Sequence, residues 1–184
     1  MFCTVLGGQT LAGQDCDRAL KRELKSGKEN DFDFRILQAV IEINDDQKKV
    51  LLPKVKNYFR GNLTGKKIAI WGLAFKPDTD DIREAPALYM IEHLLEAGAD
   101  IVVYDPEAME NVKKQKNYPI QYSDDQYSLL LDADALLICT EWSMFRNPDF
   151  ALMKKSMKNS VIFDGRNLYD VEKMQEMDWT YYSI

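Results

Sequence analysis

Short apolar runs alternate with segments of helical spacing over most of this chain. Four runs rich in branched apolar residues have the length of buried strands, at residues 67–71, 101–104, 135–139 and 161–163. Residues 85–97 carry apolar side chains at helical spacing, and Gly98 follows them as a C-terminal cap. Because strands and helices alternate, we predict an α/β fold: a Rossmann-like, doubly wound, mostly parallel sheet preceded by a long helix.

Weaker patterns predict the remaining elements of this fold. Residues 135–139 are the most apolar run, which places them at the centre of the sheet, and residues 179–183 alternate enough to form an edge strand. Further elements are expected as a charged helix or loop at 107–116, a short strand at 119–122, and helices at 123–131 and 150–157.

Ahead of the first strand, residues 32–59 have the pattern of one long helix. Apolar side chains recur every three or four residues and give it a wide apolar face. Asp31 or Asp33 is a candidate cap for its start. Pro53 lies inside the pattern, so we expect the helix to be kinked or split there. The apolar face must be covered, either by packing within the chain or by a second copy of it.

Composition narrows the class of protein. The 184 residues carry 24 basic and 30 acidic side chains, a formal net charge of −6, which argues against nucleic acid as a partner. No run approaches the ~18 apolar residues of a membrane span, and the opening residues lack the pattern of a signal peptide. We therefore expect a cytoplasmic protein without a membrane partner. The three cysteines and single histidine show no metal-ligand spacing, so no metal is predicted.

Cationic side chains follow two of the predicted strands. Lys76 and Arg83 lie in the loop after residues 67–71, and Arg166 follows residues 161–163. The carboxyl ends of parallel strands share one edge of a sheet, where such folds bind ligands. Three cations at that edge suit an anionic ligand such as a diphosphate, although each alone is more often a solvated surface charge. Gly72 stands alone after its strand, so the usual dinucleotide glycine motif is absent.

Three other positions at this edge, Asp105, Trp142 and Phe145, each allow two interpretations. Asp105 ends the second strand and is either a ribose ligand or, as we favour, the start of a turn with Pro106. Trp142 and Phe145 follow the most apolar strand. They either contact a base or sugar or, as we favour, form an aromatic wedge that closes the pocket wall.

Several motifs in order resemble one enzyme family. The segment GLAFKPDTDDIREAP at 72–86 is followed by YDP at 104–106, ICTEW at 138–142 and FDGRN at 163–167. These resemble the C-terminal domain of UDP-glucose 6-dehydrogenases, of the UDP-glucose/GDP-mannose dehydrogenase family. Residues 39–44, AVIEIN, resemble the helix that joins the two halves of those enzymes. The likeness covers roughly residues 34–184.

The resemblance implies a function and a division of the chain. It implies an unassigned segment at 1–31, a joining and dimerisation helix at 32–60 that forms a homodimer, and a UDP-sugar-binding Rossmann-like domain at 66–184. Phe75, Lys76 and Arg166 would bind the UDP-sugar substrate, and Arg83 would reach toward NAD. The family oxidises UDP-glucose to UDP-glucuronate, for polysaccharide biosynthesis, with two NAD and a catalytic cysteine.

The chain also departs from the family pattern. Gly7-Gly8 lacks the cysteine that follows the glycines of the catalytic loop, and Cys16 lacks the glycines and the Pro-Lys-Asp that should flank it. No catalytic residue is therefore assigned. We expect a chain without the NAD-binding half, which binds UDP or UDP-glucose weakly, if at all, and does not turn over. The alternatives are a GDP-mannose or UDP-N-acetylmannosamine dehydrogenase, or a non-catalytic nucleotide-sugar-binding and dimerisation module.

Overall fold

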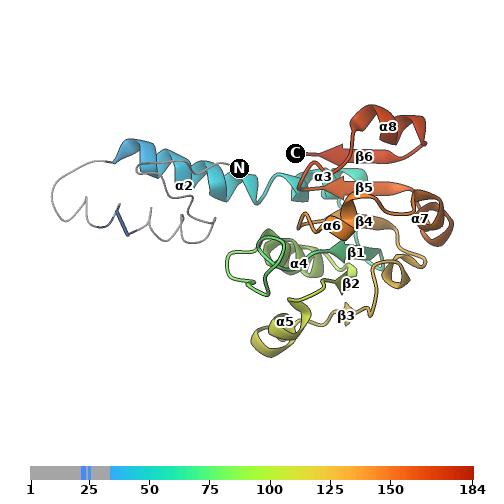
Figure 1. Cartoon of the computed structure of the whole chain (residues 1–184), viewed down its shortest axis with the longest axis horizontal. Helices are drawn as coiled ribbons and strands as arrows, with labels where there is room; N and C mark the ends of the chain where they lie inside the picture. The colour runs from blue at the N-terminus through green and yellow to red at the C-terminus, as the bar shows by residue number, and fades with distance from the viewer. Residues whose placement is uncertain (1–21, 24, 26–33) are drawn as a thin grey trace. The chain divides into compact units, whose positions relative to one another are not determined.

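A computed structural model describes residues 22, 23, 25 and 34–184 (Figure 1). The chain divides into two compact units, Met1–Lys48 and Lys49–Ile184, which are described separately. The glycine pair at 7–8, Cys16, and the candidate caps Asp31 and Asp33 lie outside the described residues. Within those residues, no helix has the length and apolar character needed to cross a membrane.

The described part of the first unit contains helix α2, Arg35–Gln47. Its apolar side chains recur at helical spacing, and none of its residues is buried. Ile36 is 78% exposed and Ile43 is 53% exposed. The helix therefore presents apolar side chains that this unit does not cover.

The second unit begins with helix α3, Leu51–Tyr58. The helix expected over 32–59 is thus two helices, separated by a turn at residues 48–50. Pro53 is the third residue of α3, where a backbone N–H has no partner within the helix and a proline costs little. The split therefore comes just before the proline rather than at it. Leu51, Leu52 and Val55 are buried, so the compact unit that holds the sheet starts well before the expected boundary at residue 66.

The sheet of the second unit has six strands, and every pair is parallel. The spatial order is β3-β2-β1-β4-β5-β6, as Figure 1 shows from the yellow edge to the red edge. The strands are β1 Lys67–Trp71, β2 Asp100–Tyr104, β3 Gln121–Tyr122, β4 Ala135–Ile138, β5 Val161–Asp164 and β6 Thr180–Ser183. This confirms the doubly wound α/β fold, with β4 fully buried between β1 and β5 and with β6 at an edge.

Short helices connect the strands of this sheet. They are α4 Pro86–Glu96, α5 Met109–Gln115, the 3₁₀ turn η1 Ser128–Leu130, α6 Ser143–Arg146, α7 Phe150–Ser156 and α8 Val171–Glu176. From β1 the chain winds outward to β2 and β3, then returns to β4 and winds the other way. The order of the strands therefore reverses between β1 and β4, which is where doubly wound folds bind ligands.

Three of these connections, η1, α6 and α8, differ from the predicted elements, and α6 was not expected from the sequence. The helix expected over 123–131 is only a single 3₁₀ turn, because the Asp125 carboxylate accepts hydrogen bonds from the backbone of Tyr127 and Ser128. Such local side-chain bonds compete with a regular helix. Helix α8 was not predicted; the Asp170 side chain caps its start by accepting from the Lys173 N–H.

Candidate functional site

The loop after β1 lies tightly against the loop after β4. Gly72 has a φ of +89°, and a Cβ atom there would lie 2.4 Å from Cβ of Thr140. The Thr140 hydroxyl in turn donates a hydrogen bond to the Ala74 carbonyl, 2.5 Å away. Only glycine therefore fits at residue 72, and the two loops are joined by hydrogen bonding as well as by contact.

Asp105 holds the loops after β1, β2 and β4 together. Its carboxylate is completely buried. It accepts hydrogen bonds from the backbone N–H groups of Leu73, Ala74, Glu107 and Ala108 and from the Trp142 indole, at 2.7–3.1 Å. Both carboxylate oxygens already accept hydrogen bonds from the protein, which supports the turn interpretation of Asp105 over the ribose interpretation.

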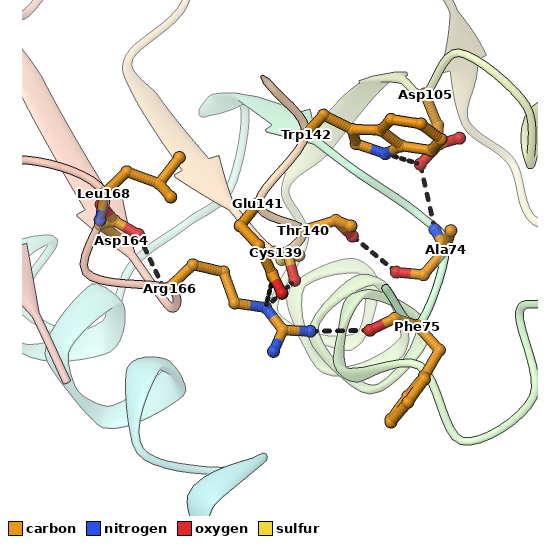
Figure 2. Close-up of polar contacts among 10 residues, drawn as sticks. All are labelled: Ala74, Phe75, Asp105, Cys139, Thr140, Glu141, Trp142, Asp164, Arg166 and Leu168. Carbon is orange, nitrogen blue, oxygen red and sulfur yellow. Dashed lines mark hydrogen bonds and ion pairs between the residues drawn. The ribbon is translucent and has the colours of Figure 1, made fainter. Parts of the chain in front are cut away.

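Arg166 joins the ends of three strands (Figure 2). Its Nε donates to the Cys139 carbonyl at 2.7 Å and its Nη2 donates to the Phe75 carbonyl at 2.9 Å. Its backbone N–H donates to the Asp164 carboxylate at 2.7 Å. These bonds connect the residues that follow β1, β4 and β5. The fork of the guanidinium group is what allows one side chain to reach two carbonyl groups at once.

The predicted cations lie at the same edge of the sheet but in different environments. Because Arg166 binds the Phe75 carbonyl, it lies beside the peptide that leads into Lys76, which is exposed. Arg83 lies farther along the loop, where its guanidinium group binds the Asp81 carboxylate through Nε at 2.9 Å and Nη2 at 2.6 Å. The structure therefore brings Arg166 to the Phe75 carbonyl, next in sequence to Lys76, whereas Arg83 lies farther along the loop beside Asp81.

An open depression of about 380 Å³ lies beside Arg83. It is lined by residues 79–83 and by Asn111 and Gln115 of α5. The Asn111 amide donates to the carbonyl and carboxylate oxygens of Asp80, both at 2.9 Å. Helix α5 therefore fixes the conformation of the loop that carries Arg83.

The two aromatic residues after β4 are part of the core. Trp142 is 6% exposed, and its indole N–H donates a hydrogen bond to the Asp105 carboxylate. Phe145 is fully buried and stacks on Trp71 with ring centroids 4.7 Å apart. This supports the aromatic-wedge interpretation and leaves base or sugar contacts to other residues.

Three positions that hold the edge together, Thr140, Asp164 and Gly165, were given no role from the sequence beyond their place in the quoted motifs. Glu141, which forms an ion pair with Arg166, was given none either. Asp164 is buried and accepts from the backbone N–H groups of Arg166 and Leu168 and from the Tyr181 hydroxyl. A Cβ at Gly165 would lie 2.9 Å from Leu51 of α3. These contacts join segments far apart in sequence. In the sequence, the available signal was that these residues directly follow or end a strand. That signal places them at the edge of the sheet but does not reveal their hydrogen-bond partners.

Cys139 is the described cysteine nearest the site, and it is buried. Burial raises the pKa of its thiol to about 12. The thiolate, which is the reactive form, is therefore a minor species at pH 8. We expect iodoacetamide to leave Cys139 unmodified in the native protein and to label it in guanidinium chloride. Peptide mass spectrometry measures both, and rapid native labelling would contradict the buried position.

Among the described residues, no cluster of three or more histidine, cysteine, aspartate or glutamate side chains is arranged to hold a metal ion. The site is thus built from backbone groups, Lys76, Arg166 and the buried carboxylates of Asp105 and Asp164. Together they form a rigid edge with exposed positive charge.

Comparison with known proteins relates this edge to one family. The UDP-binding domain of the UDP-glucose/GDP-mannose dehydrogenase family, as a family model, matches residues 69–171. The UDP-glucose 6-dehydrogenase of Pseudomonas aeruginosa is 36% identical over 187 aligned residues, which cover 98% of this chain and 41% of that protein.

Two solved structures are similar in fold and in sequence. The UDP-glucose dehydrogenase of Pyrobaculum islandicum has a TM-score of 0.77 at 27% identity and matches 95% of this chain and 38% of its own. The UDP-N-acetyl-mannosamine dehydrogenase of Staphylococcus aureus has a TM-score of 0.63 at 29% identity. The match covers 83% of this chain and 34% of that protein. The chain spans less than half the length of each of these proteins.

Proposed function

Because the chain belongs to the UDP-glucose/GDP-mannose dehydrogenase family, we propose that its second unit binds the UDP part of a nucleotide sugar at the carboxyl edge of the sheet. The position of Arg166 carries this proposal. One guanidinium group holds the loop of Phe75 and Lys76 against the ends of β4 and β5. In the proposal Phe75 and Lys76 line the bound UDP-sugar, and Arg166 holds them in place and contributes its charge.

Lys76 supplies the most accessible charge of this proposed site. It is exposed, whereas Arg166 is largely occupied by backbone carbonyls. A diphosphate bears at least two negative charges, and a lysine binds it as a point charge without a fixed orientation. Lys76 is therefore the residue whose removal should weaken ligand binding with little effect on the fold.

The Lys76→Ala variant tests the site directly. We expect its dissociation constant for UDP to rise about tenfold or more, as when a charge-assisted hydrogen bond is lost. Isothermal titration calorimetry measures it. Lys155→Ala, which removes an exposed lysine from α7, serves as the matched control and should bind like the unchanged chain. The site assignment would be wrong if the unchanged chain failed to bind UDP, or if the two variants bound it equally.

The sugar is chosen by a comparison among nucleotide sugars. We propose UDP-glucose as the ligand, with UDP-N-acetylmannosamine and GDP-mannose as the alternatives. The likeness to the Staphylococcus aureus enzyme supports UDP-N-acetylmannosamine as an alternative. Titration of the three nucleotide sugars against UDP alone separates a base preference from a sugar preference. Tighter binding of GDP-mannose than of UDP-glucose would reject the UDP assignment.

The described residues do not fit a dinucleotide on their own. The Thr140 side chain fills the space over Gly72 where an ordinary dinucleotide fold lets the pyrophosphate approach. NAD therefore enters the proposal only for the complete dehydrogenase, to which this chain contributes the nucleotide-sugar part and Arg83. We expect no NADH formation, followed by absorbance, when the chain is given UDP-glucose and NAD.

The proposal extends to a homodimer formed through residues 32–60. The exposed apolar side chains of α2 support it, because such a face is usually covered by a partner. A cytoplasmic location and a role in polysaccharide biosynthesis are predictions from the family resemblance.

A further inference from the structure

Glu141 lies against Arg166 in an unusual way. Its Oε2 atom is 3.0 Å from Nε of Arg166, a distance typical of an ion pair. The Nε–H, however, is directed at the Cys139 carbonyl at 2.7 Å. Oε2 is shut off from water and has no hydrogen-bond partner within the described chain. The pair is therefore electrostatic, without the hydrogen bond that usually accompanies it (Figure 2).

Burying a carboxylate oxygen without a hydrogen-bond donor costs free energy. Buried acceptors are almost always hydrogen-bonded, and an exception requires an explanation. The Glu141 side chain as a whole is 30% exposed, so part of it already contacts solvent. The charged partner of its carboxylate is the guanidinium group of Arg166.

The charges at this edge explain why the carboxylate matters. Lys76 and Arg166 contribute positive charges to this edge, where the buried carboxylates of Asp105 and Asp164 are already hydrogen-bonded within the protein. Glu141 adds a partly exposed negative charge beside Arg166. A diphosphate that approached Lys76 would meet the Glu141 carboxylate as a like charge beside Arg166. Like charges in such a site repel one another, and the repulsion falls when one of them moves into water.

We infer that Glu141 is the resident anion of this site and determines its affinity for anionic ligands. It neutralises Arg166 while the site is empty and turns toward solvent when the ligand's phosphate takes its place. This inference rests on the proposed binding of UDP beside Lys76 and Arg166. It adds a residue that opposes binding, so that a ligand must carry enough negative charge to displace it.

A purely structural role for Glu141 predicts the opposite result. If the carboxylate served to hold Arg166 in position, its removal would loosen the guanidinium group and weaken binding. A resident anion competes with the ligand, so its removal strengthens binding. The direction of the change in UDP affinity therefore separates the two roles.

The test is a titration of UDP into the unchanged chain and into Glu141→Gln, which keeps the shape of the side chain and removes its charge. We expect the dissociation constant to fall about three- to tenfold in the variant, the effect of removing one charge at a partly exposed site. The ratio between the two proteins should shrink as salt is raised from 50 to 500 mM, since salt screens the repulsion.

Two further variants control for shape and for total charge. Glu141→Asp keeps the charge on a shorter side chain and should gain less than Glu141→Gln. Glu172→Gln removes the same charge from an exposed position on α8 and should leave UDP binding unchanged. Urea denaturation of each variant confirms that the folded protein is compared.

The results separate this inference from the proposed function. Failure of the unchanged chain to bind UDP would count against the proposed function, and a gain of binding in Glu141→Gln would still support the resident anion. Equal or weaker binding by Glu141→Gln than by the unchanged chain, or no binding by either, would overturn the inference. An equal gain in Glu172→Gln would also overturn it, because the effect would then be one of net charge.

Discussion

Replacing Asp105 with alanine is expected to lower the free energy of unfolding by about 3–5 kcal/mol. The carboxylate is fully buried and accepts from four backbone N–H groups and one indole N–H. Its removal leaves five donors without an acceptor, and the four in buried hydrogen bonds are costly to leave unpaired. Because a typical domain is stable by only about 5–15 kcal/mol, this one change removes a large part of its stability.

Urea denaturation followed by circular dichroism measures the change. Asp100→Ala is the matched control, because Asp100 begins the same strand β2 but is exposed. A surface substitution of this kind usually changes stability by less than about 0.5 kcal/mol. A loss below about 1 kcal/mol in Asp105→Ala would show that the five donors find other partners. The binding of UDP should fall together with stability, since the loop after β1 depends on this carboxylate.

The Gly72→Ala variant is expected to lose about 3 kcal/mol or more, through strain and a steric clash. A φ of +89° is unfavourable for alanine, and the added Cβ would lie 2.4 Å from Cβ of Thr140 and 2.7 Å from its backbone nitrogen. The backbone atom cannot move away without disturbing the end of β4. The hydrogen bond from Thr140 to the Ala74 carbonyl should therefore break as well.

Gly61→Ala separates the two causes. Gly61 has a similar φ of +77°, but an added Cβ there meets no atom within 4 Å. This control carries only the conformational strain, which is about 1 kcal/mol. The difference between the two variants in urea denaturation is thus the cost of the clash with Thr140. Equal losses would mean that the loop after β4 gives way to the new side chain.

The positions of the strands, and which strand is most buried, could be predicted from the sequence because they depend on local runs of apolar residues. The apolar run of residues 135–138 has no polar face to expose, so it belongs at the centre of a sheet. Glycine and proline mark the ends of α4 in the same way. A kink or split of the long helix was expected at Pro53, but the break lies earlier, after Gln47, and Pro53 is inside α3.

The partners of the site residues could not be foreseen in the same way. The position of Arg166 after a strand predicts that it lies at the ligand edge, but not that its donors bind the carbonyls of Phe75 and Cys139. Every residue has a backbone carbonyl, so the sequence does not show which carbonyls accept a hydrogen bond from a side chain. For the same reason the unpaired oxygen of Glu141 becomes visible only once the Nε–H of Arg166 has been placed.

The bond between Arg166 and Phe75 has a consequence for the order in which the molecule is assembled. The two residues are 91 positions apart, and closing so long a loop has an entropic cost that must be met before the contact stabilises the fold. The ligand edge thus exists only after β5 has joined the sheet. Since a ligand that binds only the finished fold stabilises it by mass action, UDP should report complete folding rather than partial collapse.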